Sequence, residues 1–317
     1  MSKALLNPEG YKYNFFYDYQ MALGGMWWNQ LAMKFGSNND LERYRWLGAA
    51  PSMRQWTGGR QAAQLRGNGY TIVNEPFEAT IELQKEDFRR DKEDQVARRI
   101  GDLARKAAEH PNKLISDLIG LGESELCYDG KPFFADDHEE GESGVQSNLV
   151  DSGDYGGFDV TTPSEPTPDD MAKVLLWMVN HFWSYLDDKG DPMLGQSMDF
   201  VVMAPVHGTL LSSAIQAISQ NTLDTGSGVR DNPLIGQNFR LGYIPNPRLD
   251  WTASIAMFVR DSSVSPFILQ EEMPVDADMQ ADGSQEAFMN RRYLFGTEWN
   301  GNAGYGFWQL GMKGTFS

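Results

Sequence analysis

The sequence predicts an α+β protein in which one long helix separates two regions rich in β-strands. Apolar residues recur at three- and four-residue spacing over 91–119, which is typical of one face of a helix. Apolar and polar residues alternate over 77–84, which is typical of a half-buried strand. Similar alternation returns within 239–299, so the C-terminal part is predicted to be antiparallel sheet.

The composition excludes several classes of protein. The chain has 317 residues, of which 41% are hydrophobic, and a net charge of −17, so it can build a large core but is a poor surface for free nucleic acid. Its single cysteine, Cys127, excludes an internal disulfide framework and suits a reducing compartment. No signal peptide or membrane-length apolar run is visible, which predicts a soluble protein made in a cytoplasm.

Residues 12–35 form an aromatic segment with helical spacing at Phe15, Tyr19 and Trp27. So much aromatic surface needs to be covered. Two alternatives are open: the segment packs on the core of its own chain, or it is an arm that lies on a neighbouring copy.

The stretch from Trp46 to Gln84 predicts a β-ribbon. Gly67-Asn68-Gly69 is a hairpin-turn signal between arms at 60–66 and 70–74. A two-stranded ribbon is marginal by itself in water, so this one is expected to lie on another surface. On a neighbouring copy it would bury Leu65, Tyr70 and Ile72, and residues 57–74 would be dispensable for folding.

Pro111 falls inside the long amphipathic pattern. It either begins a second helical piece or kinks one continuous helix of about 40 Å, at ~1.5 Å per residue. A continuous helix of that length predicts a strut along an elongated domain, and two ordinary helices are the alternative.

The middle of the chain begins with an acidic stretch rich in Gly, Ser and Pro, 136–168, which predicts a surface loop. Thr167-Pro168-Asp169-Asp170 then predicts the start of a helix. A buried strand at 199–205, a second helix from Leu210 and a polar loop at 221–236 follow. Near the end, Gly301-Asn302-Ala303-Gly304 predicts a turn before a last strand through Phe307 and Gln309.

Familiar catalytic motifs are absent from the sequence, including a P-loop, a dinucleotide-binding glycine motif and a Cys-x-x-Cys pair. The densest polar cluster, Asp136-Asp137-His138-Glu139-Glu140, could bind a divalent cation or hold an acid/base pair, so a soluble hydrolase is an alternative. Adjacent loop residues rarely converge on one ion. We therefore predict no metal, cofactor or catalytic residue, and expect folding to survive Asp137→Ala with His138→Ala.

Arginines gather around the ribbon of this acidic chain. They form ordinary exposed salt bridges or meet an acidic surface on a neighbouring copy. These residues are Arg54, Arg60, Arg66, Arg89 and Arg90.

Several motifs, in order, resemble the major head subunit of Mu-like phages and prophages. They are Tyr44-Arg45-Trp46-Leu47-Gly48, Pro51-Ser52-Met53-Arg54-Gln55-Trp56, Tyr70-Thr71-Ile72, Tyr128-Asp129-Gly130-Lys131-Pro132-Phe133-Phe134 followed by His138, and Asn302-Ala303-Gly304-Tyr305-Gly306-Phe307-Trp308-Gln309.

The resemblance implies the Hong Kong 97-like (HK97-like) major capsid fold. It divides the chain into an N-terminal arm (1–45), an extended loop (46–85), a peripheral domain with a spine helix (86–135), a surface loop (136–165), an axial domain (166–250) and C-terminal strands that return to the peripheral domain (251–317).

The resemblance further implies a major capsid protein of a tailed phage or prophage, assembled in the host cytoplasm as hexamers and pentamers of an icosahedral shell around DNA. The chain has no room for a long N-terminal scaffolding segment, so a separate scaffolding protein is expected, or the segment has been removed. A portal and decoration proteins are further expected partners, with no membrane and no specific DNA binding. An encapsulin-like bacterial compartment, which shares the fold, is an alternative. The predicted subunit-interface residues are Trp27, Arg54, Trp56, Arg60, Leu65, Arg66, Tyr70 and Ile72.

Overall fold

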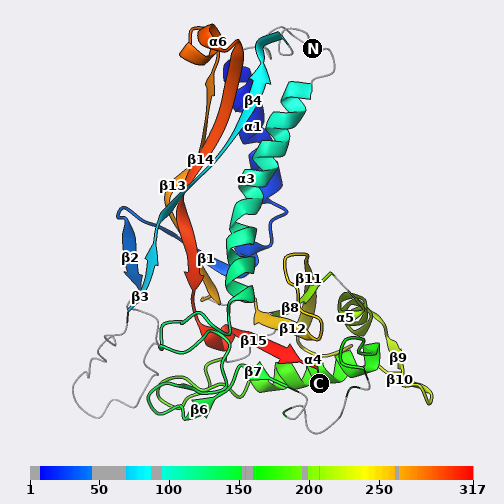
Figure 1. Ribbon diagram of the computed structural model, residues 1–317. Coiled ribbons are helices and arrows are strands. Elements are labelled where there is room, and N and C mark those ends of the chain that lie inside the picture. Colours follow the sequence, from blue (N-terminus) through cyan, green and yellow to red (C-terminus); the bar gives the residue numbers. More distant parts are fainter. Residues whose placement is uncertain are drawn as a thin grey trace.

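The protein has an elongated upper part and a broad lower part that meet at the C-terminal end of one long helix (Figure 1). The computed structural model describes residues 8–44, 69–86, 95–151, 154, 160, 162–194, 199–206, 208–260 and 264–316. Helices and strands are mixed in both parts, which confirms the predicted α+β class.

The long helix, α3 (Gln95–Gly120), is one continuous element of 26 residues with Pro111 inside it. The prediction of a single strut is confirmed, and the alternative of two helices is wrong. Its N-terminal half buries Val96 and Ile100 in the upper core, whereas Ile115 and Ile119 join the lower core. The helix therefore links the two hydrophobic cores.

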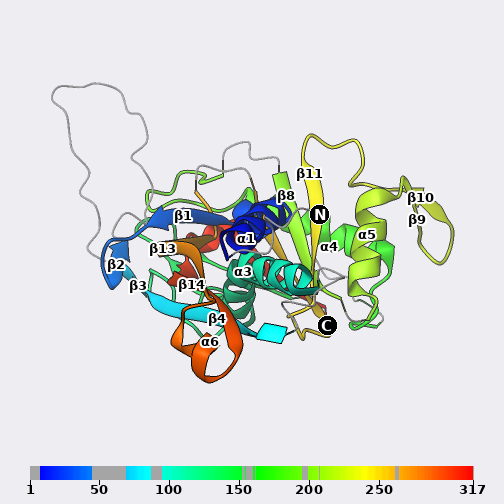
Figure 2. The same ribbon diagram turned by 90° about the horizontal axis from the view of Figure 1, so that it is seen from above.

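The N-terminal segment packs on its own chain. Helix α1 (Pro8–Leu23) lies beside α3 (Figure 2) and buries Tyr11 and Phe15. The short helix η2 (Trp28–Gln30) then leads into strand β1 (Ala32–Gly36). The alternative that this segment packs on the core of its own chain is thus confirmed for the face of α1 that carries Tyr11 and Phe15.

The upper sheet has four strands in the order β1-β13-β14-β4. The predicted strand at 77–84 is confirmed within β4, and β1 is parallel to β13. The helix α6 (Gln285–Met289) connects β13 to β14 at the far end of the sheet (Figure 1). The strands not yet bounded are β13 (Phe267–Gln280), β14 (Arg292–Tyr305) and β4 (Glu75–Gln84).

The expected turn at 301–304 is wrong, because these residues lie inside β14 and pair with β13. A Cβ on Gly301 would lie 2.3 Å from the carbonyl oxygen of Gln270, and one on Gly304 would lie 2.5 Å from Ile72. These glycines therefore allow close packing within a strand, which local sequence does not distinguish from turn formation.

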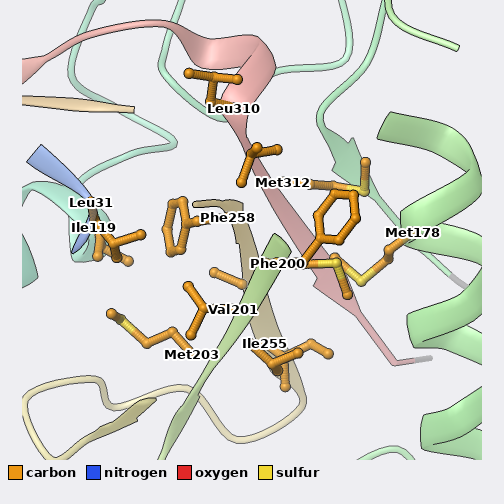
Figure 3. Close-up of a cluster of buried hydrophobic side chains, with 14 of the residues drawn as sticks. Leu31, Ile119, Met178, Phe200, Val201, Met203, Ile255, Phe258, Leu310 and Met312 are labelled. Carbon is orange, nitrogen blue, oxygen red and sulfur yellow. The ribbon is translucent and has the colours of Figure 1, made fainter. Parts of the chain in front are cut away.

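The lower sheet has five strands in the order β11-β8-β12-β15-β7. Strands β8 and β12 are buried along their whole length, so the prediction of a buried strand at 199–205 is confirmed. Figure 3 shows Phe200 of β8 and Met312 of β15 beside Met178 of helix α4 (Pro168–Phe182), whereas Phe258 of β12 lies on the opposite side, beside Ile119. The strands are β11 (Arg240–Asn246), β8 (Asp199–Pro205), β12 (Ser254–Val259), β15 (Gly311–Thr315) and β7 (Leu149–Val150).

Two helices pack beside this sheet, α4 (Pro168–Phe182) and α5 (Leu210–Ser219). The predicted start of α4 is confirmed, because Thr167 and Asp170 form a reciprocal capping box. The expected loop at 221–236 instead contains a hairpin, β9 (Thr222–Asp224) with β10 (Val229–Asp231).

The C-terminal strands differ from the expectation. Residues 308–310 form a short helix, η3 (Trp308–Leu310), and the last strand is β15. Strands β12 and β15 lie in one sheet with β8 and β11, so this sheet crosses the predicted boundary at residue 250.

Two further features concern the surface of the molecule. The predicted surface loop at 136–168 contains the short pair β5 (His138–Glu139) and β6 (Val145–Gln146) and several buried polar residues.

Among the described residues, no helix is both long and apolar enough to cross a membrane.

Candidate subunit-contact site and the buried polar network

The eight predicted interface residues fall into two groups. Arg54, Trp56, Arg60, Leu65 and Arg66 lie outside the described residues, as do Arg89 and Arg90. Trp27 and Tyr70 are half-buried against the lower core of their own chain, and Ile72 is only 3% exposed. The expectation that Ile72 needs a neighbouring copy to bury it is therefore wrong.

Residues 70–73 pair with a strand that the sequence did not predict. Strand β3 (Tyr70–Val73) pairs antiparallel with β2 (Leu41–Tyr44), and Tyr44 lies directly opposite Tyr70. This short ribbon is the base from which residues 45–68 leave and to which they return; the predicted arm at 60–66 lies outside the described residues. The sequence missed β2 because its four residues lie far from the turn signal.

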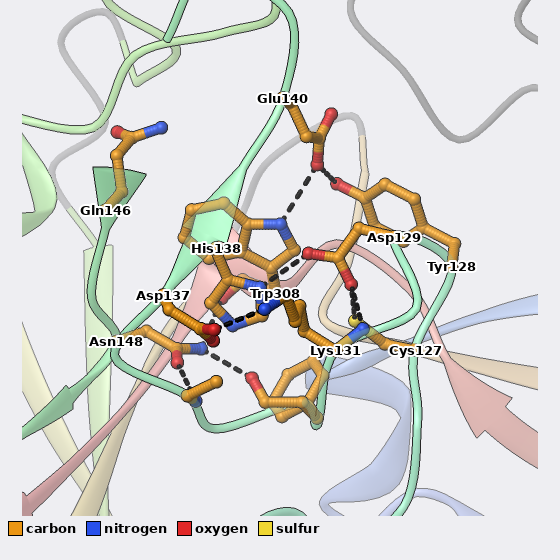
Figure 4. A network of polar contacts seen from close by, with 12 residues as sticks. Cys127, Tyr128, Asp129, Lys131, Asp137, His138, Glu140, Gln146, Asn148 and Trp308 are labelled. Carbon is orange, nitrogen blue, oxygen red and sulfur yellow. Dashed lines mark hydrogen bonds and ion pairs between the residues drawn. The ribbon is translucent and has the colours of Figure 1, made fainter. Parts of the chain in front are cut away.

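A buried polar network joins the segment at 127–148, in the middle of the chain, to the C-terminal segment around Trp308 (Figure 4). Its first centre is Asp129, which follows Cys127 in a tight turn closed by Gly130 at φ +84°. The Cys127 thiol donates to Asp129 Oδ1 at 2.9 Å, and His138 Nδ1 lies 2.6 Å from Oδ2. The turn predicted at Asp129-Gly130 is confirmed, although the flanking pairing is a single bridge between Leu126 and Pro132.

The second centre is Glu140, a carboxylate only 7% exposed. One of its oxygens accepts hydrogen bonds from the Trp308 indole at 3.0 Å, from the Gln309 amide at 3.3 Å and from the Tyr128 hydroxyl. Three donors compensate the burial of one charge. Glu140 thereby ties the 127–140 segment to the C-terminal segment around η3.

A third polar residue, Asn148, joins the same two segments. Its amide donates to the carbonyl oxygens of Phe133, Trp308 and Gly311, and its Oδ1 accepts from the backbone of Ala135 at 2.9 Å. Asn148 has no exposed surface, so each of these bonds replaces one to water. Some of the polar residues in 136–168 are therefore buried and hold other segments of the chain in place by hydrogen bonds.

Burial and hydrogen bonding shift the pKa values of this network. Burial tends to raise the pKa of Asp129, but hydrogen bonds from His138 and Cys127 outweigh it and leave the pKa below the usual value. Burial raises the pKa of the Cys127 thiol well above its usual value, and burial with the nearby Glu140 does the same for Tyr128. At neutral pH the Cys127 thiol and Tyr128 hydroxyl therefore keep their protons and act as donors.

The network offers a donor set for a metal ion, but its thiol and carboxylate already bond to each other and to His138. The ligand atoms of Cys127, Asp129 and His138 lie within 4.8 Å of one another. However, both Asp129 oxygens have partners within the network, and a thiol with a raised pKa does not supply the thiolate that binds metals. The arrangement fits internal support better than catalysis or metal binding.

The candidate hydrolase cluster at 136–140 does not converge on one point. Asp136, Asp137 and Glu139 are exposed, whereas His138 and Glu140 are buried, as an extended backbone requires. Asp137 pairs with Lys131 at the surface. The expectation of a surface loop at 136–168 is wrong for His138 and Glu140, because their burial depends on Trp308, which lies far away in the sequence.

A separate groove of about 360 Å³ lies between α3 and the edge of the upper sheet. Its floor is aromatic: the ring of His110 lies 4.3 Å from that of Phe77 and 5.5 Å from that of Trp299. On its rim, Glu109 is held by Lys106 and Arg248 at 3.0 and 3.3 Å. These charges neutralise one another, so the rim offers no converging set of reactive groups.

Solved structures with a similar fold are those of viral and virus-like shells. The procapsid of bacteriophage JBD30 matches with a TM-score of 0.55 and 20% identity over all of this chain and 77% of that one. A virus-like particle from Pyrococcus furiosus matches with a TM-score of 0.54 and 8% identity over 96% of this chain and 98% of that one. The fold is therefore that of phage capsid proteins, the Hong Kong 97-like fold.

The family follows from sequence. The model of the Mu-like prophage major head subunit gpT family matches residues 9–161 and 243–315, so the chain belongs to this family. The major capsid protein of Escherichia phage Mu is 32% identical over 138 residues, 41% of this chain and 45% of that protein. The Mu-like prophage FluMu major head subunit of Haemophilus influenzae is 31% identical over 36% of this chain and 37% of that protein. The matched stretches thus span less than half of either relative.

Proposed function

We propose that this protein is the major capsid protein of a tailed phage or prophage, and that its copies form hexamers and pentamers of an icosahedral shell around double-stranded DNA. The observation that carries the proposal is the family match over 9–161 and 243–315, which includes α1, α3, the upper sheet and the polar network. The shell is the functional unit, so no substrate, cofactor or reaction is required of the chain.

The charge of the chain supports this role. With a net charge of −17, a shell can enclose DNA without holding its phosphates, because tight binding needs Lys and Arg to release counterions. We accordingly expect the inner face to carry much of the excess negative charge. Assembly of such a chain needs compensating contacts, for which a separate scaffolding protein, a portal and decoration proteins are the proposed partners. Assembly in the host cytoplasm and the domain names given by the resemblance belong to the same proposal.

The proposed contact between copies runs through residues 45–68, with Arg54, Trp56, Arg60, Leu65 and Arg66 as its interface residues. Tyr44 lies opposite Tyr70, so a short Gly-Ser linker can join them without disturbing β2 and β3. A variant with residues 46–67 replaced in this way is expected to fold but to form no closed particles in electron micrographs. Normal shells from this variant would contradict the assignment.

A charge series gives a matched control. Changing Arg54, Arg60 and Arg66 to Glu is expected to abolish shells, whereas changing the same three residues to Lys is expected to retain them at low salt. Equal assembly of the two variants would show that their charge is not used. Particles that contain a cargo protein and no DNA would favour the encapsulin-like alternative over a phage shell.

A further inference from the structure

Gln270 is a polar residue in a strand that is otherwise apolar at this end, Phe267-Ile268-Leu269. It has no exposed surface. It occupies the middle of the upper sheet, between Phe35 of β1 and Asn302 of β14. Burying an amide is costly unless its hydrogen-bonding groups find partners.

The partners of Gln270 all belong to the base of the 45–68 segment. Its Oε1 accepts a hydrogen bond from the Tyr44 hydroxyl at 2.8 Å. Its amide nitrogen donates to Asn74 Oδ1 at 2.7 Å and to the Ile72 carbonyl at 3.3 Å. Burial, with a smaller effect of Glu42, raises the pKa of Tyr44 to about 12, so its hydroxyl remains a donor at neutral pH. One side chain thus ties β2 and β3 to β13.

Two further contacts hold the same base. Asn302 of β14 donates to the Val73 carbonyl at 2.9 Å, and Asn74 donates to the Asn39 carbonyl at 2.7 Å. The side chain of Ile72 lies over Gly304, where any Cβ would lie only 2.5 Å from it. The lack of a side chain at Gly304 therefore lets β3 pack closely against β14.

These contacts hold the two ends between which residues 45–68 run. They are separate from the Cys127, Asp129 and His138 cluster considered above as a metal site. We propose that Gln270 is a positioning residue, which fixes the direction in which residues 45–68 leave the subunit and so aligns them for contact with the next copy. The proposal rests on the proposed function, because it assigns that segment to contact between copies.

The test compares Gln270→Leu and Tyr44→Phe in the full chain by hydrogen exchange of the unassembled subunit and by electron microscopy of assembled particles. Gln270→Leu removes three hydrogen bonds and is expected to speed exchange at 41–44 and 70–73 by roughly tenfold or more, since one net hydrogen bond alone is worth about one power of ten. Exchange in α4 should not change. Tyr44→Phe removes only one donor, so it remains informative if Gln270→Leu fails to fold. In the double variant, Tyr44→Phe should add little to the effect of Gln270→Leu, because the bond between Tyr44 and Gln270 is already lost.

Asn246→Ala is the matched control. Asn246 is another buried amide, 1% exposed, which bonds to Ser116 in the lower part of the molecule. It should cost similar stability while leaving exchange at 41–44 and 70–73 and the yield of shells unchanged. Malformed or missing shells with Gln270→Leu, together with normal shells in the control, would support the proposal.

Two results would overturn it: unchanged exchange at the ribbon base in both Gln270→Leu and Tyr44→Phe, or faster exchange there with normal shells. A wild-type chain that forms no shells with any partner would contradict the proposed function instead. The exchange measurement is made on the free subunit, so it separates the two failures.

Discussion

The imidazole of His138 lies flat against the indole of Trp308, with ring centroids 4.0 Å apart and ring planes within 3°. The same imidazole is held at its Nδ1 by Asp129, at 2.6 Å. His138 has no exposed surface. The contact joins segments far apart in the chain, so His138 stabilises the packing of the 127–140 segment on the C-terminal segment around Trp308.

His138→Ala is therefore expected to destabilise the subunit, which corrects the expectation from sequence that this change is harmless. It removes a buried ring and leaves the Asp129 carboxylate without its nearest donor, at a cost of about 2–4 kcal/mol. Chemical unfolding of the purified subunit measures the loss.

Asp137→Ala is the control for that variant. Asp137 is exposed and pairs with Lys131 only at the surface, so its loss should change stability by less than about 1 kcal/mol. Equal effects of the two substitutions would show that the stacked His138 ring contributes nothing specific.

Gly304→Ala is expected to destabilise the subunit and to loosen the ribbon base. A Cβ at this position would lie 2.5 Å from Ile72 and 2.8 Å from Tyr70, so β3 must move away; overpacking of this kind costs about 1–3 kcal/mol. Gly36→Ala, at the end of β1, meets no atom within 4 Å and should be nearly neutral. Thermal unfolding of the pair, followed by circular dichroism, makes the comparison.

Glu298→Gln is expected to stabilise the subunit. Three exposed carboxylates lie directly opposite one another across the upper sheet, because Glu298 pairs with Asp276 on one side and Glu78 on the other. Like charges in such pairs cost roughly 0.2–1 kcal/mol each, and the cost falls as salt rises. The melting temperature should increase more at about 20 mM than at about 500 mM salt, because high salt already screens the repulsion that the substitution removes.

Glu82→Gln, on the neighbouring strand β4, is the matched control for Glu298→Gln. Glu82 accepts an ion pair from Arg292 at 2.7 Å, so its neutralisation should leave stability unchanged or slightly lower. Stabilisation of equal size by both changes would indicate a general effect of net charge instead of a local one.

Stability is expected to fall in acid, in part through Asp129. Its pKa in the folded subunit is lower than in the unfolded chain, where it takes the usual value near 3.8. The unfolded chain therefore binds the proton first, and the contribution of Asp129 is present above that value and is lost as the pH falls through the folded pKa. Asp129→Asn should flatten the dependence of unfolding free energy on pH below about 4. An unchanged slope would assign the acid sensitivity to other carboxylates.

Local patterns in the sequence determined several elements by themselves. The stripe from Val96 to Ile119 specifies a helix, the alternation of β4 specifies a half-buried strand, and Thr167 with Asp170 specifies a helix start. Each of these signals acts over neighbouring residues, so the physical cause lies within one turn or one strand. The ordered motifs also identified the family, which the match over both parts of the chain confirms.

Tertiary structure alone decided which polar residues and glycines are internal. Gly301 and Gly304 have the composition of a turn but lie within β14, because Gln270 and Ile72 approach them from other strands. His138 and Glu140 belong to an acidic run, yet they are buried because Trp308 and Tyr128 provide the ring and the donors that compensate burial. Strand β3 pairs with β2, and Gln270 of a distant strand bonds to both of them through Tyr44 and Ile72. Pairing and burial depend on residues far away in the chain, whose approach no local spacing records.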